Sequence, residues 1–208
     1  MKYSEYLQQN RGTFWSSPQA KYINSKRAGK SLAIELGIPV PRTFPMLPDN
    51  VMIKPDNGHS GKLCRSFLKA EDWICEERIV HDHEFRLFVF GRKVVMLQID
   101  KSSEQPDGVK IIGQSYYKYP VWERLDIDSN LRKIPSLNID VEPPICLPTM
   151  VDHSLRLAER FTLPLRVDWF VNPEGKPVFN EMCVTPGLVV AGRITEAGDT
   201  WLGSFLAV

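Results

Sequence analysis

Two apolar segments near the C-terminal end of the chain, joined by a short turn, restrict the fold more than any other feature. Residues 165–171 read LRVDWFV and residues 177–182 read PVFNEM, and both are typical of strands. Between them stands Asn-Pro-Glu-Gly at 172–175, a composition typical of a turn. The sequence therefore predicts an antiparallel β-hairpin.

Charged side chains interrupt this apolar hairpin. Because side chains alternate between the two faces of a strand, Arg166 and Asp168 share one face. On the returning strand, Phe179 and Glu181 are expected to share a face, and the turn brings Glu181 near Asp168. Mg²⁺ prefers oxygen ligands such as carboxylates, and arginine offers a planar fork to phosphate. Considered alone, the hairpin fits an ordinary salt bridge on an exposed sheet face at least as well.

A lysine precedes a glycine-bearing loop in the first half of the chain. Residues 51–55 read VMIKP, a short predicted strand that contains Lys54, and residues 56–62 read DNGHSGK. A lysine in this position can direct its ammonium at phosphates while loop amides supply further donors. The loop is not a Walker A motif, because leucine follows Gly61-Lys62. A surface turn with solvated lysines is an equally good interpretation.

Acidic residues gather at the end of the next predicted strand, at 73–77. Glu76 and Glu77 end this strand, and Glu84 opens a predicted hairpin formed by 84–90 and 93–98. These carboxylates fit either a solvated rim or a nucleotide hinge in which backbone groups meet adenine and a glutamate holds the ribose. Arg86, on the same strand face as Glu84, is a further candidate for binding phosphate.

Helical periodicity appears in two places. Apolar residues recur at helical spacing from 28 to 36, with Gly37 as a stop signal, and again from 148 to 161. Residues 100–146 suggest loops and short strands. The predicted fold class is therefore α+β.

Composition excludes several classes of protein. The chain has 208 residues, of which 43% are hydrophobic and 25% charged, and a formal charge of +1, so nothing indicates a nucleic-acid partner. No apolar stretch approaches the roughly 20 residues of a membrane span, and the N-terminal residues lack the apolar core of a signal peptide. Four cysteines without a CxxC pair suit a reducing compartment. A cytoplasmic protein without membrane insertion is expected.

Taken in order, these elements resemble the ATP-grasp superfamily. The stretches that carry the resemblance are KRAGKSLAIELGIPVP, VMIKPDNGHSGK, ICEERIVHDHEFRLFVFGRKVV and LRVDWFVNPEGKPVFNEMCVTPG. The interval from Asp168 to Glu181 is 13 residues (181 − 168) and that from Glu77 to Glu84 is seven (84 − 77), as in D-alanine–D-alanine ligases. The TupA-like branch, associated with teichuronopeptide and polysaccharide biosynthesis, resembles the chain more closely, including a final segment similar to 200–203.

The resemblance implies an ATP-grasp fold, in which two α+β subdomains grip ATP between antiparallel sheets. It divides the chain into an N-terminal helical segment at 1–46, a shortened lid subdomain at 47–78 and a C-terminal subdomain at 79–208, without a full N-terminal domain. ATP and Mg²⁺ are the implied cofactors.

The resemblance also implies roles for individual residues. The ATP phosphates would be held by Lys30 and Lys54, under a loop formed by Gly58, Ser60 and Gly61. Adenine and ribose would be framed by Glu76, Glu77 and Glu84.

The metal and the catalytic groups would come from the strands. Mg²⁺ would be bound by Asp168 and Glu181, and catalysis would be served by Arg166, Arg86 and Lys54.

Besides the missing full N-terminal domain, the sequence departs from the superfamily pattern in two ways. Cys183 stands where many relatives have a metal-binding asparagine, and a thiol is a poor Mg²⁺ ligand, so Asn180, water or phosphate is expected to complete the metal shell. Only 23 residues (77 − 54) separate Lys54 from Glu77, which is short for a lid.

The function implied is an ATP-dependent carboxylate–amine ligase that forms an acyl phosphate, in the biosynthesis of a cell-surface polymer or a peptide-like metabolite. Its substrates would be a small carboxylate and an amine. The resemblance also allows a homodimer or a partner protein. The alternatives are an ATP-dependent phosphotransferase and a degenerate nucleotide-binding module.

Overall fold

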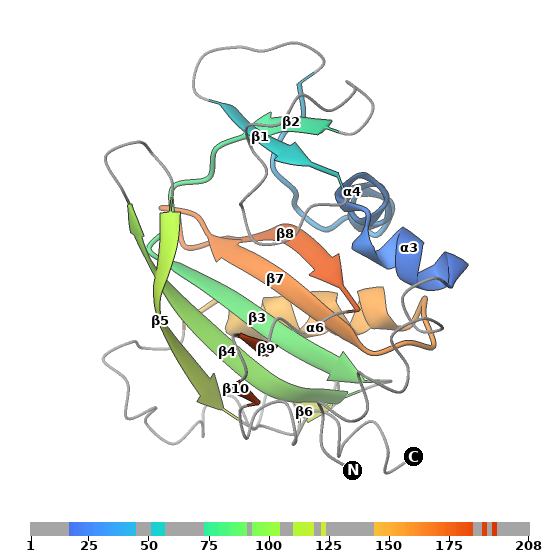
Figure 1. Ribbon diagram of the computed structural model, residues 1–208. Helices are drawn as coiled ribbons and strands as arrows, with labels where there is room; N and C mark the ends of the chain where they lie inside the picture. Colours follow the sequence, from blue (N-terminus) through green and yellow to red (C-terminus); the bar gives the residue numbers. More distant parts are fainter. Residues whose placement is uncertain are drawn as a thin grey trace.

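The computed structural model describes residues 17–44, 51–56, 73–90, 93–104, 110–118, 122–123, 144–184, 189–190 and 193–194. Its helices are α3 (Pro18–Asn24), α4 (Lys26–Glu35) and α6 (Leu147–Ala158). Its strands are β1 (Val51–Pro55), β2 (Trp73–Glu77), β3 (His83–Phe90), β4 (Lys93–Glu104), β5 (Lys110–Lys118), β6 (Trp122–Glu123), β7 (Leu165–Val171), β8 (Pro177–Cys183), β9 (Val189–Val190) and β10 (Arg193–Ile194). Figure 1 labels them along the chain.

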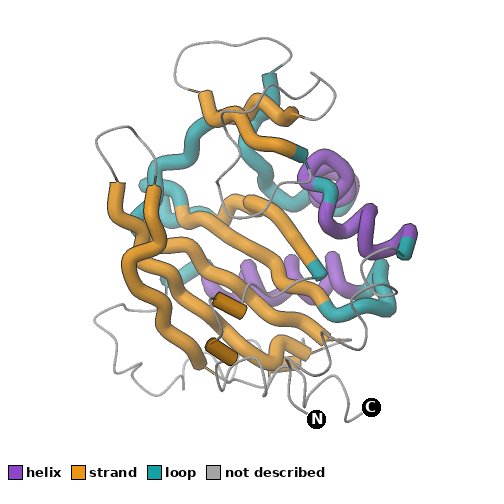
Figure 2. The backbone as a smooth tube through the Cα atoms, in the orientation of Figure 1, coloured by secondary structure: helices purple, strands orange, loops and turns teal. Residues whose placement is uncertain are grey.

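A six-stranded antiparallel sheet forms the largest layer of the molecule (Figure 2). The strand order is β5-β4-β3-β7-β8, and β6 pairs with β4 beside this path. The two predicted hairpins, β3–β4 and β7–β8, are confirmed. The expectation of loops and short strands at 100–146 is corrected in part, because β4 continues to Glu104 and pairs with the nine-residue strand β5.

Helix α6 covers one face of this sheet. Its buried residues recur every three or four positions, as expected for an amphipathic helix: Leu147, Met150, Val151, Ser154, Leu155, Leu157 and Ala158. Trp169 of β7 is fully buried, and its indole Nε1 donates to Ser154 Oγ at 2.9 Å. The apolar core therefore lies between α6 and the inner face of β3, β4, β7 and β8.

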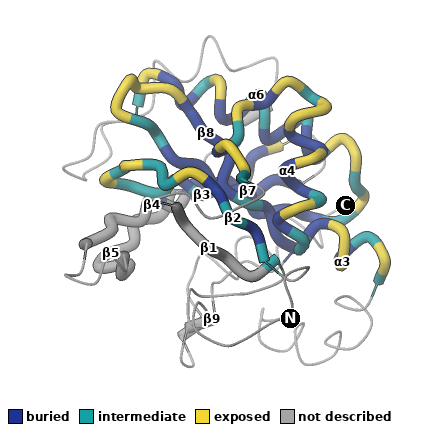
Figure 3. The backbone as a smooth tube through the Cα atoms, turned by 90° about the horizontal axis from the view of Figure 1, so that it is seen from above, coloured by how far each residue is buried: buried dark blue, intermediate teal, exposed yellow. Residues whose placement is uncertain are grey.

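Helices α3 and α4 pack against β8, at the edge of the large sheet. The side chain of Ser17 caps α3, and that of Ser25 caps α4 by accepting a hydrogen bond from the amide of Ala28. Gly37, with a positive φ of 69°, follows the end of α4, as the stop signal predicted. Figure 3 shows exposed and buried segments alternating along α4 and α6.

Strands β1 and β2 form a separate two-stranded antiparallel sheet. Thr43 makes a bridge with Glu76 of β2, so the chain that follows α4 lies along the other edge of β2. Figure 1 shows this small sheet on the same side of the large sheet as α4. Among the described helices, none combines the length and the apolar character that crossing a membrane requires.

Candidate active site

A β-bulge in β8 decides which side chains the β7–β8 hairpin presents. Asp168 pairs with Glu181, but Trp169 pairs with Phe179, so Asn180 is an extra residue in β8. The expectation that Phe179 and Glu181 share a face is therefore wrong. Phe179 is fully buried with its ring edge-to-face on Trp169, at 5.8 Å between centroids, whereas Glu181 lies on the face of Asp168.

The two predicted metal-binding carboxylates converge on one guanidinium. Arg166 donates from Nε to Asp168 Oδ1 at 2.7 Å and from Nη2 to Oδ2 at 2.6 Å. The same Nη2 lies 3.6 Å from Glu181 Oε1. Asp168 is fully buried, and the Glu181 side chain is 24% exposed. The predicted grouping of Asp168 and Glu181 beside Arg166 is confirmed.

The neighbouring strand β3 adds a second arginine and a third carboxylate to this face. Arg86 pairs with Asp168 across the sheet, and its Nε lies 3.5 Å from Asp168 Oδ2. Arg86 also donates to both oxygens of Glu84, at 3.4 and 3.3 Å. The expected proximity of Glu84 and Arg86 on one strand face is confirmed. We call Glu84, Arg86, Arg166, Asp168 and Glu181 the sheet-face cluster.

Burial and mutual charge shift the ionisation of this cluster. Burial raises the pKa of Asp168 to about 7, although Arg166 and Arg86 act in the opposite direction. Burial tends to lower the pKa of Arg166, but Asp168, Cys183 and Glu181 together outweigh this and raise that pKa well above its usual value. Burial also tends to raise the pKa of Glu84, and Arg86 reverses that shift, so the pKa is lowered. Arg166 therefore stays charged in this buried place.

Lys26, which the sequence reasoning did not single out, reaches the same cluster from helix α4. Its Nζ lies 3.0 Å from Glu181 Oε2, and the residue is 8% exposed. Lys26 and Lys30 are four positions apart, so they lie on the same face of the helix. The spacing of four residues from Lys30, to which the resemblance gave a role, was the sequence signal that could have pointed to Lys26.

Lys30 is held in a buried contact between the two sheets. Its Nζ lies 2.9 Å from Glu76 Oε2 in β2 and donates to the backbone carbonyl of Asn180 in β8 at 2.8 Å. Lys30 and Glu76 are 3% and 1% exposed. Glu77 is exposed, and its Oε2 accepts from the Arg42 amide at 3.4 Å. The structure thus brings Lys30 and Glu76 together and leaves Glu77 at the surface.

The start of the glycine-bearing loop is tied to the N-terminus of α4. Asp56 accepts hydrogen bonds from Ser25 Oγ at 2.9 and 3.1 Å and from the Arg27 amide at 2.7 Å. In β1, Lys54 stands opposite Ile74 of β2. The Lys54 side chain lies outside the described residues, as do the predicted loop residues Gly58, Ser60 and Gly61.

The donor set of the sheet-face cluster fits a magnesium ion. Two of its three carboxylates, Asp168 and Glu181, lie opposite each other on neighbouring strands, and Mg²⁺ is usually bound by one or two carboxylates together with phosphate oxygens and water. Among the described residues, no group of three or more His, Cys, Asp or Glu side chains has an arrangement suited to a metal. Cys183 is buried at the end of β8. The protein would therefore share the coordination of Mg²⁺ with a ligand.

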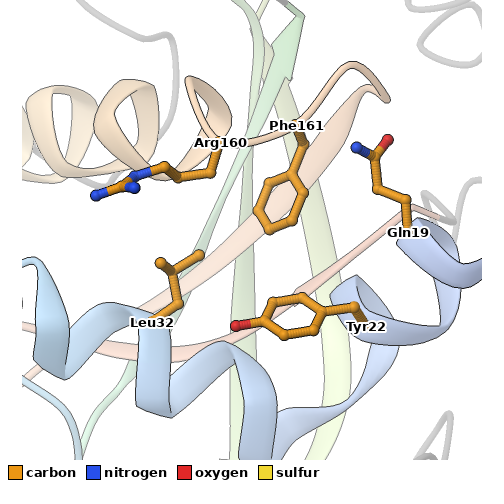
Figure 4. Close-up of a pocket in the computed structure, with 5 residues that line it drawn as sticks. All are labelled: Gln19, Tyr22, Leu32, Arg160 and Phe161. Carbon is orange, nitrogen blue, oxygen red and sulfur yellow. The ribbon is translucent and has the colours of Figure 1, made fainter.

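A shallow pocket of about 350 Å³ lies between α3, α4 and the segment after α6 (Figure 4). Gln19, Tyr22, Leu32, Arg160 and Phe161 line it, and none of these is a predicted site residue. Its charged residue, Arg160, pairs with Glu35 at 3.3 Å with both side chains at least half exposed. The pocket therefore shares no residue with the sheet-face cluster.

The architecture is that of the ATP-grasp fold. The predicted α+β fold with antiparallel sheets is confirmed by solved structures that share it. The sequence matches no protein-family model, and no curated protein matches it significantly.

Three solved structures illustrate the likeness. The macrocyclase MdnC from Microcystis aeruginosa, bound with a precursor peptide, has a TM-score of 0.55 at 14% identity over 99% of this chain and 70% of its own. The ATP-grasp ligase PsnB, complexed with a precursor peptide and AMPPNP, has a TM-score of 0.54 at 15% identity over 96% and 64%. The D-alanine–D-alanine ligase from Bacillus anthracis has a TM-score of 0.52 at 13% identity over 89% and 67%. The chain thus spans about two thirds of these proteins.

Proposed function

We propose that this protein is an ATP-dependent carboxylate–amine ligase that activates its acid as an acyl phosphate. The observation that carries the proposal is the convergence of Asp168 and Glu181 on the Arg166 guanidinium, on a sheet face flanked by a lysine-bearing helix. The ligase names of the structural neighbours give further support.

Asp168 and Glu181 are the proposed ligands of Mg²⁺, with Asn180 as the further candidate. When bound, the ion would neutralise phosphate charge and act as a Lewis acid toward the transferring phosphoryl group. The neighbouring PsnB has been solved with Mg and ADP, which supports magnesium and a nucleotide as the ligands proposed here.

The arginines of the site are held in place by carboxylates of the protein itself. Arg166 and Arg86 are fixed by hydrogen bonds to Asp168 and Glu84. Donors that are already oriented stabilise developing charge without reorganisation at the moment of reaction. We assign Arg166 and Arg86 to the oxygens of the transferring phosphoryl group, and Lys54 to the phosphates of ATP.

The reaction follows from the chemistry of the acid. A carboxylate acylates poorly because its leaving group would be oxide, and phosphorylation supplies a good leaving group. An amine then attacks the acyl carbon and releases phosphate, forming an amide. In this proposal Glu76, Glu77 and Glu84 lie on the side of adenine and ribose, and the residues 58, 60 and 61 cover the phosphates.

The finer assignment also follows the sequence resemblance. The TupA-like pattern favours a product that belongs to a cell-surface polymer, and the peptide-bound neighbours favour a peptide-like metabolite. A reaction that consumes ATP fits a cytoplasmic location. A homodimer or a partner protein would supply additional substrate contacts.

A specific observation favours a second candidate, a degenerate nucleotide-binding module. Cys183 is buried, 5% exposed, two residues from Glu181 on the same strand, and a thiol is a poor ligand for Mg²⁺. A module of this kind would bind Mg-ATP without turning it over.

Product analysis with Mg-ATP and panels of acids and amines tests the proposal. We expect ADP release that depends on both an acid and an amine, with an amide as product. A phosphorylated substrate without an amide would identify a phosphotransferase, and binding of Mg-ATP without ADP release in any combination would identify the module.

A further inference from the structure

The side chain of Lys30 joins the two sheets at the point where β8 is bulged. Its Nζ contacts Glu76 Oε2 of the small sheet at 2.9 Å and the Asn180 carbonyl of the large sheet at 2.8 Å. The ring of Phe179 lies 5.9 Å from the same Nζ. Because Lys30 is 3% exposed and bound on both sides, its ammonium is committed to protein groups.

The carbonyl that Lys30 contacts belongs to Asn180, the bulged residue that determines which face of the sheet the following side chains of β8 occupy. Without the bulge, the pairing of Trp169 with Phe179 would continue to Asp168 with Asn180, and Glu181 would turn to the opposite face of the sheet. The backbone of a bulged residue leaves the regular ladder, so contacts from outside the strand pair help to fix it. Lys30 supplies such a contact from α4.

We propose that Lys30 is a positioning residue for Glu181. By holding the Asn180 carbonyl, it keeps the bulge that places Glu181 opposite Asp168, and through Glu76 it ties this geometry to the small sheet. Lys30 then acts through the backbone of β8 and does not touch the nucleotide. This inference rests on the proposed function in one respect, which is that Glu181 binds the metal ion.

Binding measurements on the full chain separate this role from direct phosphate binding. Calorimetry would follow ADP without metal, and then Mn²⁺ in the presence of ADP, for the wild type, Lys30→Met and the control Lys21→Met, whose lysine is exposed on α3. Loss of groups that orient metal ligands costs about 10–100-fold in metal affinity, so we expect that loss for Mn²⁺ with Lys30→Met. The affinity for metal-free ADP should stay as in the wild type and the control. An equal loss of metal-free ADP affinity would show a direct phosphate contact and overturn the proposal.

A second variant separates positioning from simple neutralisation of Glu76. Lys30→Met leaves a buried carboxylate without this lysine, which destabilises the fold. Lys30→Met/Glu76→Gln removes that charge, so the melting temperature should recover while Mn²⁺ affinity stays low. Recovery of both quantities would mean that Lys30 serves only to neutralise Glu76, and the proposal would be wrong.

Hydrogen exchange keeps this test independent of the proposed function. If the wild type binds neither Mn²⁺ nor ADP, the proposed function fails, but the positioning role still predicts faster amide exchange in β8 of the Lys30→Met/Glu76→Gln variant. Exchange in β4, far from α4 in the strand order, serves as the internal control. Unchanged exchange throughout β8 would overturn the inference.

Discussion

The sheet-face cluster holds its charges by mutual contact, residue by residue. Asp168 is buried against two arginines, and Glu181 is shared between Arg166 and Lys26. A buried charge is tolerated only when it is paired, so each of these side chains depends on the others. Removing one of these side chains therefore changes both the chemistry of the site and its balance of charge.

Glu181→Gln tests the metal assignment at the more accessible carboxylate. We expect ATP turnover to fall by about a hundredfold or more, because a catalytic metal ion contributes several kcal/mol of charge stabilisation. Asp168→Asn should have the same effect with a larger loss of stability, since Asp168 is fully buried. Glu174→Gln, at an exposed turn position of the same hairpin, is the matched control. Turnover near the wild-type rate in Glu181→Gln would refute the assignment.

His153 of α6 gives the protein a predicted dependence of stability on pH. Burial lowers the pKa of His153 below its ordinary value of 6.5, with smaller opposing and supporting contributions from Asp152 and Arg156. As pH falls below 6.5, the unfolded chain binds a proton at this position before the folded protein does, so the free energy of unfolding decreases.

Urea denaturation at pH 7.5 and 5.5 checks this dependence. The loss of stability on acidification should be smaller in His153→Gln than in the wild type. An identical loss in both proteins would show that other groups cause it.

At the scale of elements, α4 holds the parts of the site together. Its N-terminus is bound to Asp56 beyond β1, Lys30 reaches Glu76 in β2, and Lys26 reaches Glu181 in β8. The helix can approach β8 closely because residue 29 is small. A Cβ at this position would lie 3.5 Å from atoms of Met182 and Phe179. The small side chain thus lets both lysines reach their carboxylates.

Substitutions at Gly29 measure how close this approach must be. A contact of 3.5 Å is ordinary, so Gly29→Ala should fit and stabilise the helix by about 0.5–1 kcal/mol. Gly29→Leu should overpack the interface and cost about 1–3 kcal/mol. Chemical denaturation of both variants gives these values, and a destabilised Gly29→Ala would mean that the helix packs more tightly against β8 than the structure shows.

At the scale of the molecule, Lys30 of α4 connects the small sheet, through Glu76, to the large sheet, through the backbone carbonyl of Asn180. Ligands that bind only the folded protein stabilise it by mass action. Mg-ATP at 100 times its dissociation constant should add about 2.7 kcal/mol, seen as a rise in melting temperature.

Magnesium or ATP alone should raise the melting temperature less than the two together. In Glu181→Gln the additional effect of magnesium should disappear. A rise of the same size in this variant would place the metal elsewhere.

The sequence by itself determined the two hairpins, the main helices and which charged residues are candidates for the site. Arg166 and Asp168 are two positions apart on one strand, so their shared face follows from the alternation of side chains alone. Strands β1 and β2 and helix α4 were likewise predicted from local patterns, because glycine stop signals and apolar spacing act over a few residues.

Only the tertiary structure decided which residues meet across elements. The bulge at Asn180 places Glu181 opposite Asp168, as expected, but separates it from Phe179, which pairs with Trp169 and is buried. The contacts of Lys26 with Glu181 and of Lys30 with Glu76 join residues 155 and 46 positions apart (181 − 26 and 76 − 30). Register and helix docking depend on the packing of the whole core, which no local pattern records.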